Sequence, residues 1–162
     1  MQKNIKSKLV SLSFLFFLAF PAIAQEDTTM YVKKDFLILI STKSYPAALA
    51  KAKQVAASEH IGLQLRGLAE NKISGLSYSK KECEKEDLDY PSYYARGRWD
   101  DGVYVSIEYS DAYSEFAKGY YIVIAASGSR EEDEIKVAYH KIKQRYKDAY
   151  FKSGKVYMGC MH

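Results

Sequence analysis

The sequence predicts an α+β domain, in which two βαβ units form a mostly antiparallel sheet with two helices on one face. Two stretches of the chain, 36–67 and 120–154, lead to this fold class. Each begins with a short apolar run, passes through a turn of small residues into a helical pattern, and ends in a second short strand pattern. The chain from 25 to 162 has a length that suits a single domain with one core.

The first unit is expected to contain a strand, a helix and a second strand. Residues 36–40 form a continuous apolar run of strand length. Ser44 suits the N-cap of the following helix and Pro46 its first turn, where a missing N–H costs nothing. The second strand is expected at 61–65. The helix itself is indicated by apolar residues at helical spacing: Tyr45, Ala48, Leu49, Ala52, Val55 and Ala56.

The second unit repeats this order. An apolar strand starts near Tyr120, and a turn of small residues follows it. Ser129 and Glu132 have the spacing of a capping box, so a helix is expected over 130–146. A closing strand is expected at 149–152, and residues 155–159 are expected either to continue it or to add another strand. The helical stripe consists of Ile135, Ala138, Tyr139, Ile142 and Tyr146.

An insert separates the two units. Residues 68–101 are charged and lack a sustained period, which predicts a loop or a short helix. Residues 102–110 then alternate with a period of two, as a strand does. Val103, Val105, Ile107 and Tyr109 share one face and are expected in the core. The other face, which is expected to point away from the core, carries Tyr104, Ser106, Glu108 and Ser110.

The first 24 residues have the pattern of a secretory signal peptide. Three lysines precede an apolar run at 9–20, and Ala22-Ile23-Ala24 provides a small-x-small cleavage site. The apolar run is too short for a membrane span, and no transmembrane segment is expected after it. We therefore expect a chain that starts near Gln25 in a bacterial periplasm or outside the cell.

Charge argues against a nucleic-acid partner. The chain has 24 basic and 20 acidic residues, and the three lysines of residues 1–24 leave 21 basic residues against 20 acidic ones after cleavage. A nucleic-acid-binding protein normally shows a concentrated basic excess, which this chain lacks. All 15 tyrosines follow the cleavage site, and tyrosine favours half-wet surfaces such as interfaces and sugar sites.

The two cysteines, Cys83 and Cys160, are expected to form a disulfide in an oxidising compartment. A bond between them would close a long loop and contribute roughly 3–4 kcal/mol in the chain-entropy model. The alternative is a pair of unpaired thiols.

Residues typical of catalysis or metal binding are sparse, so we expect no enzyme, no cofactor and no metal site. The histidines His60, His140 and His162 occur in no zinc-binding motif. Carboxylates are frequent at 82–89 and 100–101, as a glycosidase requires, but such runs are more typical of solvated loops and turns.

A cluster of aromatic and arginine residues precedes the alternating strand: Tyr93, Tyr94, Arg96, Arg98 and Trp99. Exposed aromatic rings offer flat faces to sugars, and arginine offers forked donors to carboxylates and hydroxyls. The alternative is a satellite core under the insert, in which the arginines pair with its acidic residues.

The strand–turn–helix pattern resembles the SPOR (sporulation-related repeat) domain. The resemblance lies in FLILIS at 36–41 with AALAKAK at 47–53, and in YYIVIAAS at 120–127 with the helix after it. It implies a ferredoxin-like βαββαβ plan and binding of peptidoglycan glycan strands through the sheet face opposite the helices. On this chain the face would carry Tyr104, Ser106 and Glu108, with Arg96, Arg98 and Trp99 at its rim.

Two hypotheses about function follow. The first is a periplasmic, non-catalytic module that binds peptidoglycan glycan strands. The second is a secreted inhibitor or immunity protein that binds a wall-degrading enzyme, because Tyr, Trp and Arg dominate the energetics of protein interfaces.

Overall fold

The sheet that organises the fold has four antiparallel strands in the order β4-β5-β1-β6. The structure is a computed structural model that describes residues 30–160, so the expected signal peptide at 1–24 lies outside the described residues. The strands are β1 (Tyr31–Thr42), β4 (Gly102–Tyr109), β5 (Tyr121–Gly128) and β6 (Tyr150–Tyr157). The predicted α+β class with an antiparallel sheet is confirmed.

Both predicted long helices form, as α1 (Tyr45–Glu59) and α3 (Asp133–Arg145). The side chain of Ser44 caps α1 as expected, accepting a hydrogen bond from a first-turn N–H at 3.3 Å. The start of α3 expected at 130 is wrong: the helix begins at Asp133 with Glu132 as its N-cap and no side-chain cap, and the hydrogen bond from the Ser129 N–H to the Glu132 carboxylate at 3.0 Å lies in the turn before it. Within residues 30–160, no helix combines the length and apolar character needed to cross a membrane.

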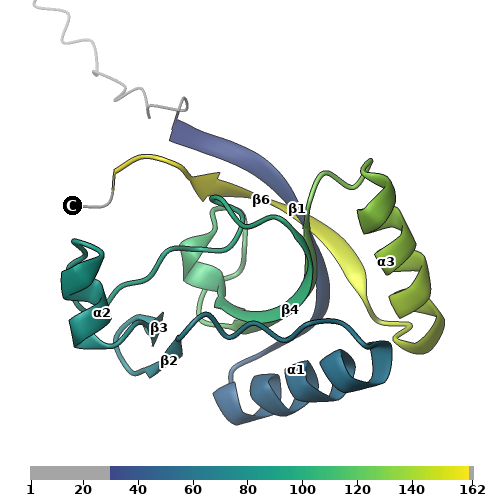
Figure 1. Cartoon of the computed structure of the whole chain (residues 1–162), viewed down its shortest axis with the longest axis horizontal. Coiled ribbons are helices and arrows are strands. Elements are labelled where there is room, and N and C mark those ends of the chain that lie inside the picture. The colour runs from purple at the N-terminus through teal and green to yellow at the C-terminus, as the bar shows by residue number, and fades with distance from the viewer. Residues whose placement is uncertain (1–29, 161–162) are drawn as a thin grey trace, which may run out of the picture.

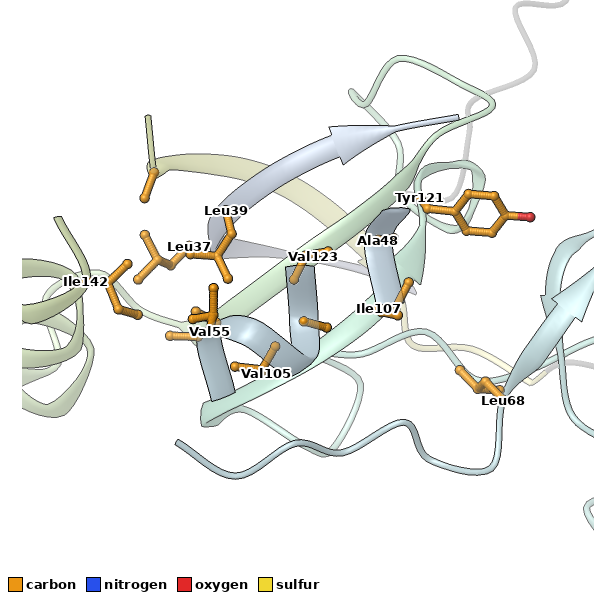
Figure 2. Close-up of a cluster of buried hydrophobic side chains, with 14 of the residues drawn as sticks. Leu37, Leu39, Ala48, Val55, Leu68, Val105, Ile107, Tyr121, Val123 and Ile142 are labelled. Atoms are coloured by element: carbon orange, nitrogen blue, oxygen red, sulfur yellow. The ribbon is translucent and has the colours of Figure 1, made fainter. Parts of the chain in front are cut away.

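One face of the sheet is covered by α1 and α3 (Figure 1). Figure 2 shows Leu37 of β1 near Val55 of α1 and Ile142 of α3, and all three side chains are fully buried. Val105 and Ile107 of β4 belong to the same core, as the alternation in the sequence predicts. The helices and the sheet are therefore joined through one apolar layer.

The opposite face is covered by two stretches of chain outside the sheet, 93–98 and 110–118, which we call the covering loops; the second begins with a 3-10 helix. Tyr113 and Phe116 of the second loop pack against Phe36 of β1, with ring centroids 4.9 and 6.0 Å from that of Phe36. All eight residues of β5 are buried, because the strand has packed side chains above and below it. The sheet thus has two buried faces.

The prediction of a strand at 61–65 is wrong. Only Leu63 forms a bridge there, parallel to Val105 of β4. His60 and Arg66 have φ values of 54° and 53°, so the chain is left-handed on both sides of this short stretch. The extended backbone cannot continue past these residues, and the first unit ends in a bridge.

The insert at 68–101 contains more regular structure than the charge pattern predicts. In Figure 1 its elements lie together at one side of the sheet, away from α3. They are β2 (Ala69–Asn71), β3 (Gly75–Ser77) and α2 (Lys80–Lys85), and a 3-10 helix (Ser110–Ala112) follows β4.

Candidate functional site

The residues expected to recognise a partner divide into a buried group and an exposed one. Trp99 is 70% exposed, and Tyr94 is half-buried. The buried group consists of Tyr93, Arg96, Arg98, Tyr104, Ser106 and Glu108. The expectation that the polar side of β4 is an open binding face is therefore wrong, since the covering loops lie over it.

Arg96 attaches the first covering loop to the sheet. Its side chain is fully buried, and the guanidinium carbon lies 3.6 Å from the centroid of the Tyr104 ring. Nitrogens of the guanidinium donate hydrogen bonds of 2.8–3.3 Å to acceptors on β4 and β5: Gly102 O, Tyr104 O, Ser106 Oγ, Ile124 O and Ser127 Oγ. This set of acceptors explains why a charged side chain is tolerated there.

Glu108 is a second buried charge on the same side of β4. Its carboxylate accepts hydrogen bonds from Arg66 Nη2, from the Arg96 N–H at 3.2 Å and from the Tyr113 hydroxyl at 3.1 Å. Burial raises the pKa of Glu108, and the Arg66 charge opposes that rise. Burial is also the largest influence on Arg66 and disfavours its cation, but Glu108, Tyr113, Asp100 and Tyr104 together outweigh it and raise the pKa of Arg66. Arg66 and Glu108 are therefore joined as an ion pair beside β4.

A groove of about 430 Å³ lies beside this network. Its volume falls within the range of roughly 300–1,000 Å³ that is typical of small-molecule sites. The residues that line it come from the turn just before the insert, from α2 and the residues next to it, and from the chain before β4: Arg66, Tyr78, Glu82, Glu86, Tyr94, Ala95, Trp99 and Asp100. We take this groove as the candidate functional site.

An aromatic row forms one part of the lining. Tyr78 and Tyr94 meet edge to face at 6.5 Å between ring centroids, and Tyr94 and Trp99 at 5.1 Å. The Arg98 guanidinium lies 4.4 Å from the Trp99 ring centroid and donates to two carbonyls at the end of β6 and just beyond it. Trp99 is thus exposed to solvent but supported by Tyr94 and Arg98.

Charged groups form the rest of the lining. Asp100 accepts hydrogen bonds from the Gly97 N–H and the Tyr104 hydroxyl, each at 2.8 Å, and from Arg66 at 3.3 Å. Glu82 and Glu86 lie on α2 and at its C-cap, four residues apart. That spacing places them on the same side of a helix. The groove thus combines aromatic faces, hydrogen-bond acceptors and one guanidinium.

Of the residues that line this groove, only Tyr94 and Trp99 were predicted from the sequence. Glu82, Glu86 and Asp100 were interpreted as parts of a solvated loop and a turn, and Arg66 and Tyr78 were given no role. Ser79, followed three residues later by Glu82, has the capping-box spacing. That signal would have predicted α2 and with it the common orientation of the two glutamates.

The predicted disulfide is not formed, because Cys83 and Cys160 are free thiols in this structure. Cys83 is fully buried, and its thiol donates to the Ser92 carbonyl at 3.5 Å. Cys160, by contrast, is exposed beyond the end of β6. The side chain of Cys83 is thus turned into the interior of the insert rather than toward the surface.

Comparisons with models of known families, with curated proteins and with solved structures find no match to this chain. Among residues 30–160, no three His, Cys, Asp or Glu side chains are arranged to hold a metal ion.

Proposed function

We propose that this protein is a non-catalytic binding module of the bacterial cell envelope, and that its groove binds peptidoglycan glycan strands. The exposed Trp99 at the rim of a groove with mixed aromatic and charged lining carries this proposal. The C–H faces of sugar rings stack on aromatic side chains, while sugar hydroxyls bond to carboxylates and guanidinium groups. Both kinds of group line this groove.

The proposal differs in one respect from what the SPOR resemblance implies. That resemblance puts the glycan on the sheet face opposite the helices, which the covering loops occupy in this chain. A glycan bound in the groove would contact α2, Tyr78 and the residues next to Trp99 instead. We therefore keep the glycan expected from the sequence as the ligand, but assign it to the groove rather than to the sheet face.

The inhibitor hypothesis is the second candidate, and the pairing of Trp99 with Arg98 and Tyr94 favours it. A standard protein interface, however, buries about 800 Å² on each partner around an apolar centre. Among residues 30–160, the other large exposed apolar side chains are distributed over β1, the insert, α3 and β6. The concave groove therefore favours the glycan.

A sedimentation assay with protein-free peptidoglycan tests the proposal. We expect the protein to sediment with the wall, and more of it after an amidase has removed the stem peptides. Trp99→Ala should weaken binding by about 1–3 kcal/mol, the scale of a stacking contact. Tyr150→Ala is the matched control, because Tyr150 is 43% exposed and lies on β6, outside the groove.

Three outcomes would contradict the proposal. Equal recovery of protein in the supernatant with and without peptidoglycan would exclude glycan binding. A stoichiometric complex with a wall hydrolase in the absence of glycan would favour the inhibitor hypothesis instead. If Tyr150→Ala weakens binding and Trp99→Ala does not, the glycan binds outside the groove.

A further inference from the structure

We infer that the groove selects sugar units that carry a free, protonated amino group over the same units in N-acetylated form. The inference rests on the proposed glycan-binding function and specifies its ligand. It is carried by the position of two carboxylates beside the aromatic row, and by the ammonium group that they already hold.

Glu82 and Glu86 converge on one ammonium in the structure. Lys85 Nζ lies 2.9 Å from Glu82 Oε1 and 3.3 Å from Glu86 Oε1. Two carboxylates that both reach a single nitrogen can hold a primary ammonium of a ligand in the same way. The Lys85 side chain is 67% exposed and does not line the groove, so a ligand could replace it at little cost.

The other cations near the groove are already engaged. Arg66 donates to Asp100, to the Tyr94 carbonyl and to Glu108. Arg98 lies against the Trp99 ring and donates to backbone carbonyls near the end of β6. Lys85 is therefore the cation that a ligand must displace, and it is the most exposed of the three.

The aromatic row also favours a ligand that carries an ammonium group. Tyr78, Tyr94 and Trp99 lie in contact along the groove, and the faces of such rings attract cations. An amino sugar could stack its ring on Trp99 and place its ammonium between the glutamates. Acetylation removes the charge and adds bulk at the same nitrogen, so an N-acetyl sugar would keep the stacking contact alone.

The single tryptophan of the chain makes this testable by fluorescence, because any change in its emission reports on the groove. The probes are β-1,4-linked tetramers of glucosamine and of N-acetylglucosamine, titrated at mildly acidic pH and low salt. We expect about tenfold tighter binding of the glucosamine tetramer, the scale of one cation held by aromatic and acidic groups. The preference should fall as salt is added.

Three variants identify the groups responsible. The double variant Glu82→Gln, Glu86→Gln should abolish the preference while retaining weak binding of both tetramers. Lys85→Ala should strengthen binding of the glucosamine tetramer, because it removes the competing ammonium. Glu84→Gln is the matched control: Glu84 is exposed on the same helix α2 but does not line this groove, so its variant should behave as the wild type.

The result separates the two proposals. Equal or tighter binding of the N-acetylated tetramer would overturn the charge selection and leave the glycan-binding function intact. Failure of both tetramers and of intact peptidoglycan to bind would overturn the proposed function and the inference together. A preference that survives the double glutamine variant would also refute the role of these carboxylates.

Discussion

Replacing Arg96 by alanine should destabilise the protein strongly without changing how its folded form binds. Arg96 is fully buried, and its guanidinium donates to acceptors on two strands while stacking on Tyr104. Arg96→Ala would deprive these acceptors of their donor. It would also create a cavity between the first covering loop and β4. The variant therefore tests whether this loop is fixed to the sheet or is a mobile binding surface.

The size of the effect follows from the contacts. A buried acceptor that loses its donor lowers the free energy of unfolding by about 1–3 kcal/mol. Part of this loss is offset, because the variant no longer has to bury the guanidinium charge. Removal of one partner from a buried charged network typically costs roughly 3–5 kcal/mol in total. For a domain of this size, 1 kcal/mol shifts the melting temperature by about 4 °C, so a fall of about 12–20 °C is expected.

The assay is calorimetric melting of the wild type, Arg96→Ala and Trp99→Ala under identical conditions. Trp99 lies three residues away and is 70% exposed, so its variant should change stability by less than about 1 kcal/mol. The affinity for the glycan should show the reverse pattern. It should be unchanged per folded molecule in Arg96→Ala and weakened in Trp99→Ala. If Arg96→Ala melts within about 3 °C of the wild type, the buried network does not stabilise the fold as argued.

Two further predictions concern acid stability and thiol reactivity. The Arg130 side chain, by hydrogen bonds to Asp35 at 2.7 and 2.9 Å, lowers the pKa of that carboxyl below its ordinary value of 3.8. The stabilisation is therefore present above pH 3.8 and is lost as the pH falls through the lower, folded-state value. The stability difference between the wild type and Asp35→Asn should thus shrink below about pH 4 in denaturant titrations, whereas a constant difference would contradict the ion pair. For the thiols, a thiol reagent should modify Cys160 in the native protein and Cys83 only after unfolding, and failure of both to react in denaturant without reductant would show a disulfide.

Local patterns in the sequence were sufficient for most of the secondary structure. Ser44 and the apolar spacing after it determine α1, and the alternation over 102–110 determines β4. Such patterns depend on residues within a turn or two of each other. The expected strand at 61–65 failed because the left-handed backbone at Arg66 leaves no sign in the apolar pattern.

The site was decided by tertiary contacts. Alternation places Glu108 and Val105 on different faces of β4. Whether the face with Glu108 is exposed to solvent depends on the covering loops, which come from other parts of the chain. Arg96 is buried because acceptors on two strands surround it. Arg66 and Asp100 are 34 positions apart and share the groove only because the insert folds back beside β4. A sequence read one segment at a time contains the residue types of such a site, but which of them meet is decided by the packing of distant segments.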